Sequence, residues 1–382
     1  MSFEARPMFS RDLVDVTEQP MFFGTPVNVA RYDVSKYPIF NKLTDLQHAA
    51  FWRPEEINLD QDAVQFNKQL SDHERFIFVE NLSYQILLDS VQGRAPVIAF
   101  LPYVSIPELE PCISAWAFME TIHSRSYTHI LRNVFNNPKP IFDGILGKKE
   151  IMDRALAVTQ YYDSFITYAK LYELFGVGDH SLNGEKITIT TRELKKKLYM
   201  ALMSVYVLES VRFYVSFACA FALAERGLMK GNADIISLIA RDEAMHIGIS
   251  SDILKFLSKK EQDLELTSVI AESQDATCGL FAEAATQEKN WASYIFSKGS
   301  IIGLNEKILN EYIEHMVAKR MTTVGLEPIF AKRPNPIDWI DNWLDTSTKQ
   351  VRPQEVQVIN YEKGGGTVND LGEKNPFEGF SL

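Results

Sequence analysis

Cysteine is scarce in this chain, which has three among its 382 residues. Cys112, Cys219 and Cys278 are widely spaced, and their odd number leaves at least one without a partner. This pattern argues against a disulfide framework and against a thiolate metal site. A reducing, cytoplasmic setting is therefore expected.

The sequence also has little that would direct it to a membrane. Its first residues, Met1 to Pro7, show no basic stretch followed by an apolar one, so no secretion signal is predicted. The most apolar run covers residues 213–224 and is flanked by Arg212 and Glu225. Twelve residues are too short to span a bilayer, and we expect no membrane segment.

An excess of positive charge is absent as well. The 39 Lys and Arg residues are outnumbered by 50 Asp and Glu residues, which gives a net charge of −11, and no basic block interrupts this balance. Binding to nucleic acid or to an anionic membrane through general electrostatics is therefore not expected. The chain also shows no glycine-rich phosphate loop, so we expect it to bind no nucleotide by itself.

Helical signals dominate, and strand signals are nearly absent. A capping box at Ser71 and Glu74 marks the start of one helix. Asn183-Gly184, between apolar or β-branched residues, predicts a small β-hairpin within residues 176–191. Helices are expected over residues 40–51, 71–93, 108–136, 149–175, 192–225, 233–257, 264–293 and 305–324. The predicted class is all-α, a helical bundle with one hairpin insertion.

Composition predicts three segments along the chain. Residues 1–36, which contain several prolines, are expected to form an extended arm, and residues 37–345 a single helical domain. Residues 346–382 have few apolar anchors and contain Gly364-Gly-Gly366, which predicts a flexible tail. Its apolar end, residues 377–382, is open to two interpretations: a docking peptide or a frayed terminus.

The most informative pattern is a repeated Glu-x-x-His. Glu120-Thr-Ile-His123 and Glu243-Ala-Met-His246 lie on two separate helical segments. Residues three apart share a helix face, so each carboxylate and its imidazole can bind the same metal ion. In a chain of this composition, chance alone would produce about 0.5 occurrences of the pattern. Two occurrences are therefore weak evidence of a metal site by themselves.

Two further acids strengthen the interpretation. Asp89 and Glu209 each lie among apolar residues, 31 and 34 positions before the following Glu-x-x-His. An ionised carboxylate in such surroundings is costly unless it is paired or bound to metal. Two Glu-x-x-His helices and two acid-bearing helices make the di-metal carboxylate site of a ferritin-like four-helix bundle, which is the fold we expect. The alternative is a salt-bridge network without metal.

The ligand types predict the metal. Four carboxylates and two imidazoles favour iron or manganese over zinc or copper(I). Four negative charges also cancel two divalent cations. The set does not decide between iron and manganese.

A tyrosine lies close to this predicted site. Tyr127 follows His123 by one helical turn, about 5.4 Å of rise, on the same face. Spacing from the ligands predicts an apolar shell around it, formed by Phe213, Phe217 and Ile239. A phenol beside an oxidising cluster, shielded from water, can persist as a radical. The alternative for Tyr127 is an ordinary core tyrosine with one hydrogen bond.

Beyond these patterns, the chain resembles a known family over almost its whole length. The resemblance is carried by Pro20-Met-Phe-Phe-Gly24, Phe51-Trp-Arg-Pro-Glu-Glu56, Leu87-Leu-Asp-Ser-Val-Gln-Gly-Arg94, Glu120-Thr-Ile-His-Ser-Arg-Ser-Tyr127, Arg192-Glu-Leu-Lys-Lys-Lys-Leu198, Glu209-Ser-Val-Arg-Phe-Tyr-Val-Ser-Phe217 and Arg241-Asp-Glu-Ala-Met-His246. In these motifs the chain resembles the small, radical-generating β subunit of class Ia ribonucleotide reductase, bacterial type.

The resemblance implies a role for each site residue. It implies that Asp89, Glu120 and His123 hold one iron ion and that Glu209, Glu243 and His246 hold the other. It also implies that dioxygen reacts there and that Tyr127 carries a stable radical. Trp52 and Asp242 would link the cluster to the surface, with Asp242 also orienting a ligating imidazole.

The same resemblance assigns the tail to a partner. Glu355 and Tyr361 match the segment that relays the radical to the large (α) catalytic subunit. The last residues, with Phe380 and Leu382 as anchors, would dock in a groove of that subunit. A homodimer of this chain is also implied.

Two other classes of function remain open from the sequence. A ferritin-like di-iron oxygenase or oxidase would share the ligand set but would need an open substrate pocket and no partner tail. An iron-storage or purely structural bundle would need neither Trp52 nor Tyr127.

Overall fold

The computed structural model describes residues 10, 11 and 13–345. The fold is all-α, as predicted. Its helices are α1 Ile39–Ala49, α2 Asp60–Lys68, α3 Asp72–Gln92, α4 Leu109–Val134, α5 Lys139–Gly144, α6 Lys149–Phe175, α7 Thr191–Val207, α8 Tyr214–Glu225, α9 Lys230–Lys259, α10 Leu264–Glu272, α11 Gln274–Ile295, α12 Glu306–Thr323 and α13 Ile340–Leu344. Short 3-10 turns occupy η1 Pro54–Glu56, η3 Leu101–Tyr103 and η4 Ile145–Gly147, and π-helical turns occupy η2 Pro96–Phe100 and η5 Leu208–Arg212.

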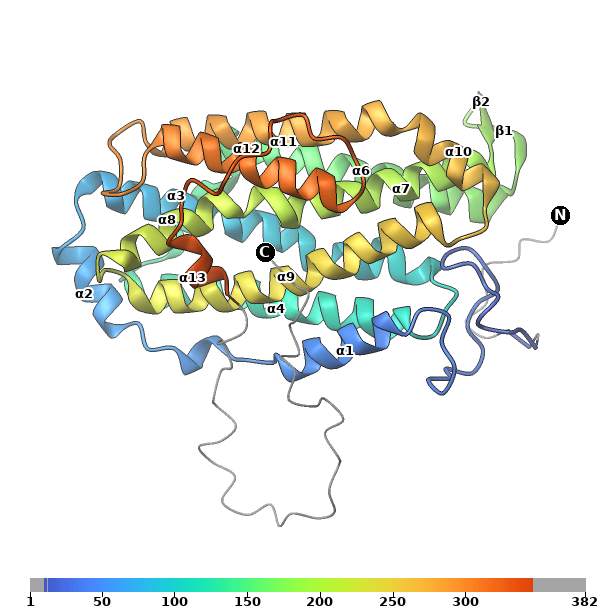
Figure 1. Cartoon of the computed structure of the whole chain (residues 1–382), viewed down its shortest axis with the longest axis horizontal. Coiled ribbons are helices and arrows are strands. Elements are labelled where there is room, and N and C mark those ends of the chain that lie inside the picture. The colour runs from blue at the N-terminus through green and yellow to red at the C-terminus, as the bar shows by residue number, and fades with distance from the viewer. Residues whose placement is uncertain (1–9, 12, 346–382) are drawn as a thin grey trace, which may run out of the picture.

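The long helices lie side by side along the longest axis of the molecule and form a bundle (Figure 1). In Figure 1, α11 and α12 lie along one edge of the bundle and α1 lies along the opposite edge, beside α4 and α9. The interior of this arrangement is formed by α3, α4, α9 and the stretch from α7 to α8. A single hydrophobic core runs through the described part of the chain, so the bundle buries its apolar faces against one another.

Helix α3 begins where the sequence predicts. The side chain of Ser71 accepts a hydrogen bond from the backbone N–H of Glu74, and Glu74 Oε2 accepts one from the backbone N–H of Ser71 at 2.9 Å. This reciprocal capping box satisfies two N–H groups that a helix start leaves free. The helix ends at Gln92, just before Gly93, so Asp89 lies in its last turn.

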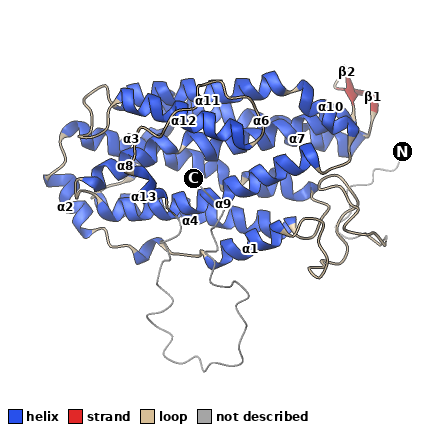
Figure 2. Ribbon diagram, in the orientation of Figure 1, coloured by secondary structure: helices blue, strands red, loops and turns tan. Residues whose placement is uncertain are grey.

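The predicted hairpin is confirmed. Strand β1, Gly178–Leu182, pairs antiparallel with β2, Glu185–Ile189, and Leu182 lies opposite Glu185. The two turn residues have positive φ, 53° at Asn183 and 85° at Gly184, as a two-residue hairpin turn requires. Figure 2 shows these strands at one end of a molecule that is otherwise helix and loop in its described part.

Two helices predicted as continuous are interrupted. Residues 192–225 form α7, the π-helical turn η5 and α8, and the π turn contains Glu209. Residues 264–293 divide into α10 and α11 at Ser273. Helices α2, α5 and α13 were not predicted. Sequence periodicity detects long helices more readily than their local interruptions or short neighbours.

Helix α2 supplies a cap for a distant helix. The carboxylate of Asp62 accepts hydrogen bonds from the backbone N–H groups of Gly231 at 3.0 Å and Asn232 at 2.7 Å, at the start of α9. A carboxylate stabilises the partial positive charge of a helix N-terminus. The sequence does not show this contact, because Asp62 lies 169 positions before Gly231 and 170 positions before Asn232.

The described part of the predicted arm packs on the bundle. Met21 and Phe22 are buried, and Phe22 forms an isolated β-bridge with Val104. The predicted tail, residues 346–382, lies outside the described residues. The boundaries of the three segments remain predictions.

One helical stretch is long and apolar enough to cross a membrane by length and composition alone. It covers residues 191–225, which is longer than the 12-residue run apparent in the sequence. Of its most apolar window, 89% is buried inside the protein, as expected for a core helix. We therefore assign it to the core of the bundle.

Candidate metal centre

Six acidic and imidazole side chains meet in the middle of the bundle. They come from four helical segments and are fully buried: Asp89 from α3, Glu120 and His123 from α4, Glu209 from η5, and Glu243 and His246 from α9. Their ligand atoms form two groups, each with all atoms within 4.8 Å of one another. One group contains Asp89, Glu120 and His123, and the other contains Glu120, Glu209, Glu243 and His246. All six residues predicted as ligands are therefore brought together.

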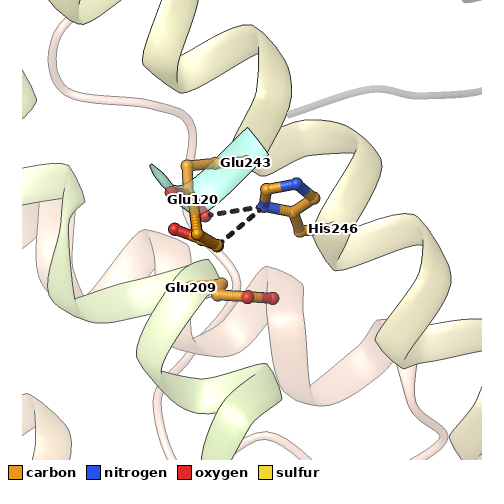
Figure 3. Close-up of side chains that lie close together, drawn as sticks. All are labelled: Glu120, Glu209, Glu243 and His246. Atoms are coloured by element: carbon orange, nitrogen blue, oxygen red, sulfur yellow. Dashed lines mark ion pairs between the residues drawn. The ribbon is translucent and has the colours of Figure 1, made fainter. Parts of the chain in front are cut away.

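Two carboxylates lie between the two imidazoles. Glu120 has its Oε1 3.0 Å from His246 Nδ1 and its Oε2 3.2 Å from His123 Nδ1. Glu243 has its Oε2 3.6 Å from His246 Nδ1 and its Oε1 3.3 Å from His123 Nδ1. Each carboxylate thus turns one oxygen toward each imidazole. Figure 3 shows His246 pointing toward both of them, with Glu209 nearby. If two ions were held here, Glu120 and Glu243 would each offer one oxygen on the His123 side and one on the His246 side.

Many polar atoms of the cluster have no hydrogen-bond partner. They are both oxygens of Asp89 and of Glu243, Oε2 of Glu209 and both ring nitrogens of His246. Buried polar groups are rarely left in this state, because each one loses its hydration without compensation. Two cations at this position would satisfy the carboxylate oxygens and one ring nitrogen of His246. The donor set, mostly carboxylate oxygen with some imidazole nitrogen, fits iron or manganese.

The buried charges shift one another's titration strongly. Burial and the neighbouring carboxylates raise the pKa of Asp89 and of Glu209 well above the usual value. Burial alone would also raise the pKa of Glu120, but His246 and His123 outweigh it and lower that pKa to about 2. Burial would lower the pKa of His246, but Glu120 and Glu243 raise it to about 9. Without ions the cluster holds protons, and ions would have to displace them.

Asp242 fixes the orientation of His123. Its Oδ2 lies 3.2 Å from His123 Nε2 and accepts a 2.8 Å hydrogen bond from the indole N–H of Trp52. Burial alone would raise the pKa of Asp242, but Arg241 and His123 outweigh it and lower the pKa, so the group stays ionised. Because Nε2 faces Asp242, Nδ1 faces the carboxylates, as a ligating nitrogen must. The structure thus brings together Trp52, Asp242 and His123.

Glu209 is held by residues that sequence reasoning missed. Its Oε1 accepts hydrogen bonds from Gln92 Nε2 at 2.6 Å and from Trp116 Nε1 at 3.0 Å, and the hydroxyl of Tyr162 donates to Gln92 Oε1 at 2.7 Å. Oε2 is left without a partner. Spacing could have found two of these residues, since Gln92 is three positions after Asp89 and Trp116 is four before Glu120.

Tyr127 is fully buried and lies close to the cluster. Its hydroxyl makes no hydrogen bond of standard geometry, yet burial and then the charge of Asp89 raise its pKa well above the usual value. The predicted shielding residues, Phe213, Phe217 and Ile239, are also fully buried. The rings of Phe213 and Phe217 stack with centroids 5.9 Å apart. Glu355 and Tyr361 lie outside the described residues.

Comparisons with known proteins agree with this geometry. The family model described as "Ribonucleotide reductase, small chain" matches residues 31–336. The chain is 51% identical over 356 residues to "Ribonucleoside-diphosphate reductase 1 subunit beta" of Escherichia coli O157:H7, covering 93% of this chain and 94% of that protein. It is 50% identical over 374 residues to "Ribonucleoside-diphosphate reductase subunit beta" of Haemophilus influenzae, covering 98% and 99%.

Solved structures have the same fold. "Ribonucleotide reductase R2 subunit from Clostridium botulinum" superimposes with a TM-score of 0.73 at 25% identity, covering 90% of this chain and 99% of that one. A dimanganese(II)-NrdF structure from Streptococcus sanguinis gives a TM-score of 0.65 at 18% identity, covering 83% and 99%, which shows the shared fold alone.

Proposed function

The chain belongs to the ribonucleotide reductase small-chain family, and from that premise we propose that its buried cluster holds two iron ions that react with dioxygen and oxidise Tyr127 to a stable radical. The enzyme activity of the family members it matches is that of ribonucleoside-diphosphate reductase. The radical would be passed to the large subunit, which reduces ribonucleotides to deoxyribonucleotides. The observation that carries the proposal is the placement of Glu120 and Glu243, each with one oxygen toward each imidazole.

The residues around the site prepare this chemistry. When bound, the two ions would supply two of the four electrons that reduce dioxygen to the level of water. Tyr127 would supply the third electron, and an external one-electron reductant such as excess Fe(II) would supply the fourth. Glu209 would ligate through Oε2, since two donors already occupy Oε1. Asp242 would hold His123 with Nδ1 toward the ions. Burial of the whole set excludes water, which preserves a reactive species from side reactions.

Tyr127 has the properties that a stored radical needs. Its raised pKa keeps the phenol protonated, so oxidation must remove a proton together with the electron. Asp89 would accept that proton, because its charge acts on this phenol more strongly than any other charge. The buried rings of Phe213 and Phe217, with Ile239, would exclude reductants from the site.

The route out of the centre would begin at Trp52. This indole is 1% exposed and is hydrogen-bonded to Asp242, which contacts His123. From there the radical would pass to Tyr361, with Glu355 assisting proton movement, and on to the large subunit, on which the last residues of the tail dock. We also propose a homodimer and a cytoplasmic location.

Iron is the proposed metal because the redox step needs an ion that dioxygen oxidises. Manganese is accepted by the same donors, and the neighbour from Streptococcus sanguinis is a dimanganese(II) protein by its title. The four carboxylates balance two divalent ions of either metal in a site with no exposed surface.

Anaerobic loading with Fe(II), followed by oxygen, tests the proposal. We expect two iron ions per chain and a tyrosyl signal in the electron paramagnetic resonance spectrum, and reductase activity only after the large subunit is added. A radical-free protein that oxidises small organic substrates would favour the di-iron oxygenase or oxidase instead. Uptake of many iron ions per chain would favour iron storage.

A further inference from the structure

Arg320 is a buried cation without an acidic partner. It lies on α12, its exposed fraction is 2%, and no carboxylate of residues 10–345, position 12 excepted, is within ion-pair distance of its guanidinium. Removing an arginine charge from water is strongly unfavourable unless hydrogen bonds and charges compensate. The contacts that replace a carboxylate are therefore informative.

These contacts are made to the π-helical turn that contains Glu209 and to the helices on either side of it. Arg320 Nη2 donates to the Tyr214 hydroxyl at 3.1 Å, and Nε donates to the backbone carbonyl of Ser210 at 3.4 Å. The Tyr206 hydroxyl donates to the backbone carbonyl of Arg320 at 3.0 Å. The guanidinium also lies over the Tyr214 ring, 5.5 Å from its centroid. Arg320 thus contacts the chain before, within and after η5.

The π turn needs such support. A single π turn inside an α-helix is uncommon and is found mostly where function requires it. If η5 relaxed to α-helical geometry, the register would change by one residue, a rotation of about 100° around the helix axis. Glu209 would then turn away from Gln92, Trp116 and the other carboxylates. The hydrogen bonds to its Oε1 hold the side chain, but they do not hold the backbone.

We propose that Arg320 is a positioning residue that holds the η5 backbone through Ser210 and so keeps Glu209 in the metal centre. This rests on the proposed function in one respect, that Glu209 is a metal ligand. Arg320 acts through Ser210 and contacts none of the six ligands. The ion held by Glu209 depends on Arg320, and the ion held by Asp89 does not.

Titration of the metal-free protein with Mn(II) tests this directly. Bound manganese is counted, and electron paramagnetic resonance separates an exchange-coupled pair from a single isolated ion. We expect the wild type to bind two ions as a coupled pair. Arg320→Met should lower the affinity for the second ion by about 10- to 100-fold, the usual effect of losing a residue that orients a ligand. Its spectrum should be that of a single isolated ion. Arg320→Lys should recover part of the coupled signal.

The neighbouring Lys319→Met is the matched control. It removes a cation from the same helix without touching Tyr206, Ser210 or Tyr214, and it should bind two ions as the wild type does. If circular dichroism shows that Arg320→Met does not fold, Tyr214→Phe replaces it in the test. This variant removes only the hydroxyl contact and should lower the affinity for the second ion several-fold.

The outcomes are distinguishable. A wild type that never forms a coupled pair contradicts the proposed function itself. A wild type with two ions, together with Arg320→Met or Tyr214→Phe variants that bind both ions with unchanged affinity, overturns the role of Arg320 alone. An equal loss of affinity for both ions would show a general structural role of Arg320 and would also overturn the proposed positioning role.

Discussion

The indole N–H of Trp52 and the carboxylate of Asp242 are joined by a 2.8 Å hydrogen bond across 190 positions of sequence. The same oxygen, Oδ2, lies 3.2 Å from Nε2 of His123. One atom thus connects an aromatic side chain on the loop after α1 with an imidazole of the metal centre. The connection is buried along its whole length.

Trp52→Phe separates radical formation from radical transfer. Phenylalanine keeps an aromatic ring in the core but removes the N–H donor and the readily oxidised indole. We expect the variant to bind two metal ions and to form the Tyr127 radical, while reductase activity with the large subunit falls by at least about 100-fold. Trp343→Phe, which removes a similar N–H donor to Glu225, should keep its activity. Wild-type turnover by Trp52→Phe would exclude this route.

Tyr127→Phe tests the location of the radical. Only the hydroxyl is removed, and that hydroxyl makes no standard hydrogen bond in the structure, so folding and metal loading should be unaffected. The radical signal should disappear from the electron paramagnetic resonance spectrum and activity should be lost. Tyr312→Phe is the control, because the Tyr312 hydroxyl is also buried and without a hydrogen-bond partner, and it should keep the radical. A tyrosyl signal in the Tyr127 variant would assign the radical elsewhere.

Glu120 belongs to both ligand groups, whereas Asp89 belongs to one. Glu120→Gln is therefore expected to lose both ions, and Asp89→Asn to lose one. An ion present at 100 times its dissociation constant stabilises the folded protein by about 2.7 kcal/mol, so loading should raise the melting temperature of the wild type and leave that of Glu120→Gln unchanged. Glu288→Gln, which alters a buried carboxylate outside the two groups, should still bind two ions. Two ions in Glu120→Gln would show that the two groups do not both depend on Glu120.

The core of this site could be predicted from the sequence because helix geometry is local. Residues three apart on a helix share a face in any helix, so Glu120 and His123 had to lie together. Asp89 and Glu209 stood out because they were acids in apolar surroundings. The sequence also specified the ends of α3 and the hairpin turn, whose capping and turn residues act within a few positions.

The π turn at Glu209 could not be predicted in this way. It changes the register by one residue inside a stretch whose helical propensity is continuous, and its stabilising contacts come from Arg320, 110 positions away. The cap that Asp62 provides for α9 is equally non-local. Such features depend on how helices pack, which local sequence patterns do not encode.

Lys319 predicts a pH dependence of stability. Burial lowers the pKa of Lys319 to about 8 from an ordinary value of 10.5. Between these values the unfolded chain binds a proton that the folded protein does not, so this group makes the folded state more stable as pH rises from about 8 to 10.5. Lys319→Met should remove that increase.

The measurement is the difference in unfolding free energy between wild type and Lys319→Met, taken from denaturant titrations at several pH values. The variant should be the more stable protein at pH 7, and its advantage should shrink as pH rises through the window. The exposed Lys307→Met, on the same helix, serves as the control and should show no such trend. A difference that stays constant with pH would contradict the burial argument.

Removal of the tail tests its proposed docking role. These residues lie outside the described part of the structure, and none of the six ligands, Tyr127 or Trp52 is among them. Deletion of residues 365–382 should therefore leave metal content and the radical signal unchanged while reductase activity with the large subunit is lost. A synthetic peptide of residues 377–382 should compete with the full-length chain for the large subunit, since short docking segments bind through a few apolar anchors. A truncated chain with undiminished activity would show that the two subunits associate through the helical domain instead, and the peptide would then fail to inhibit.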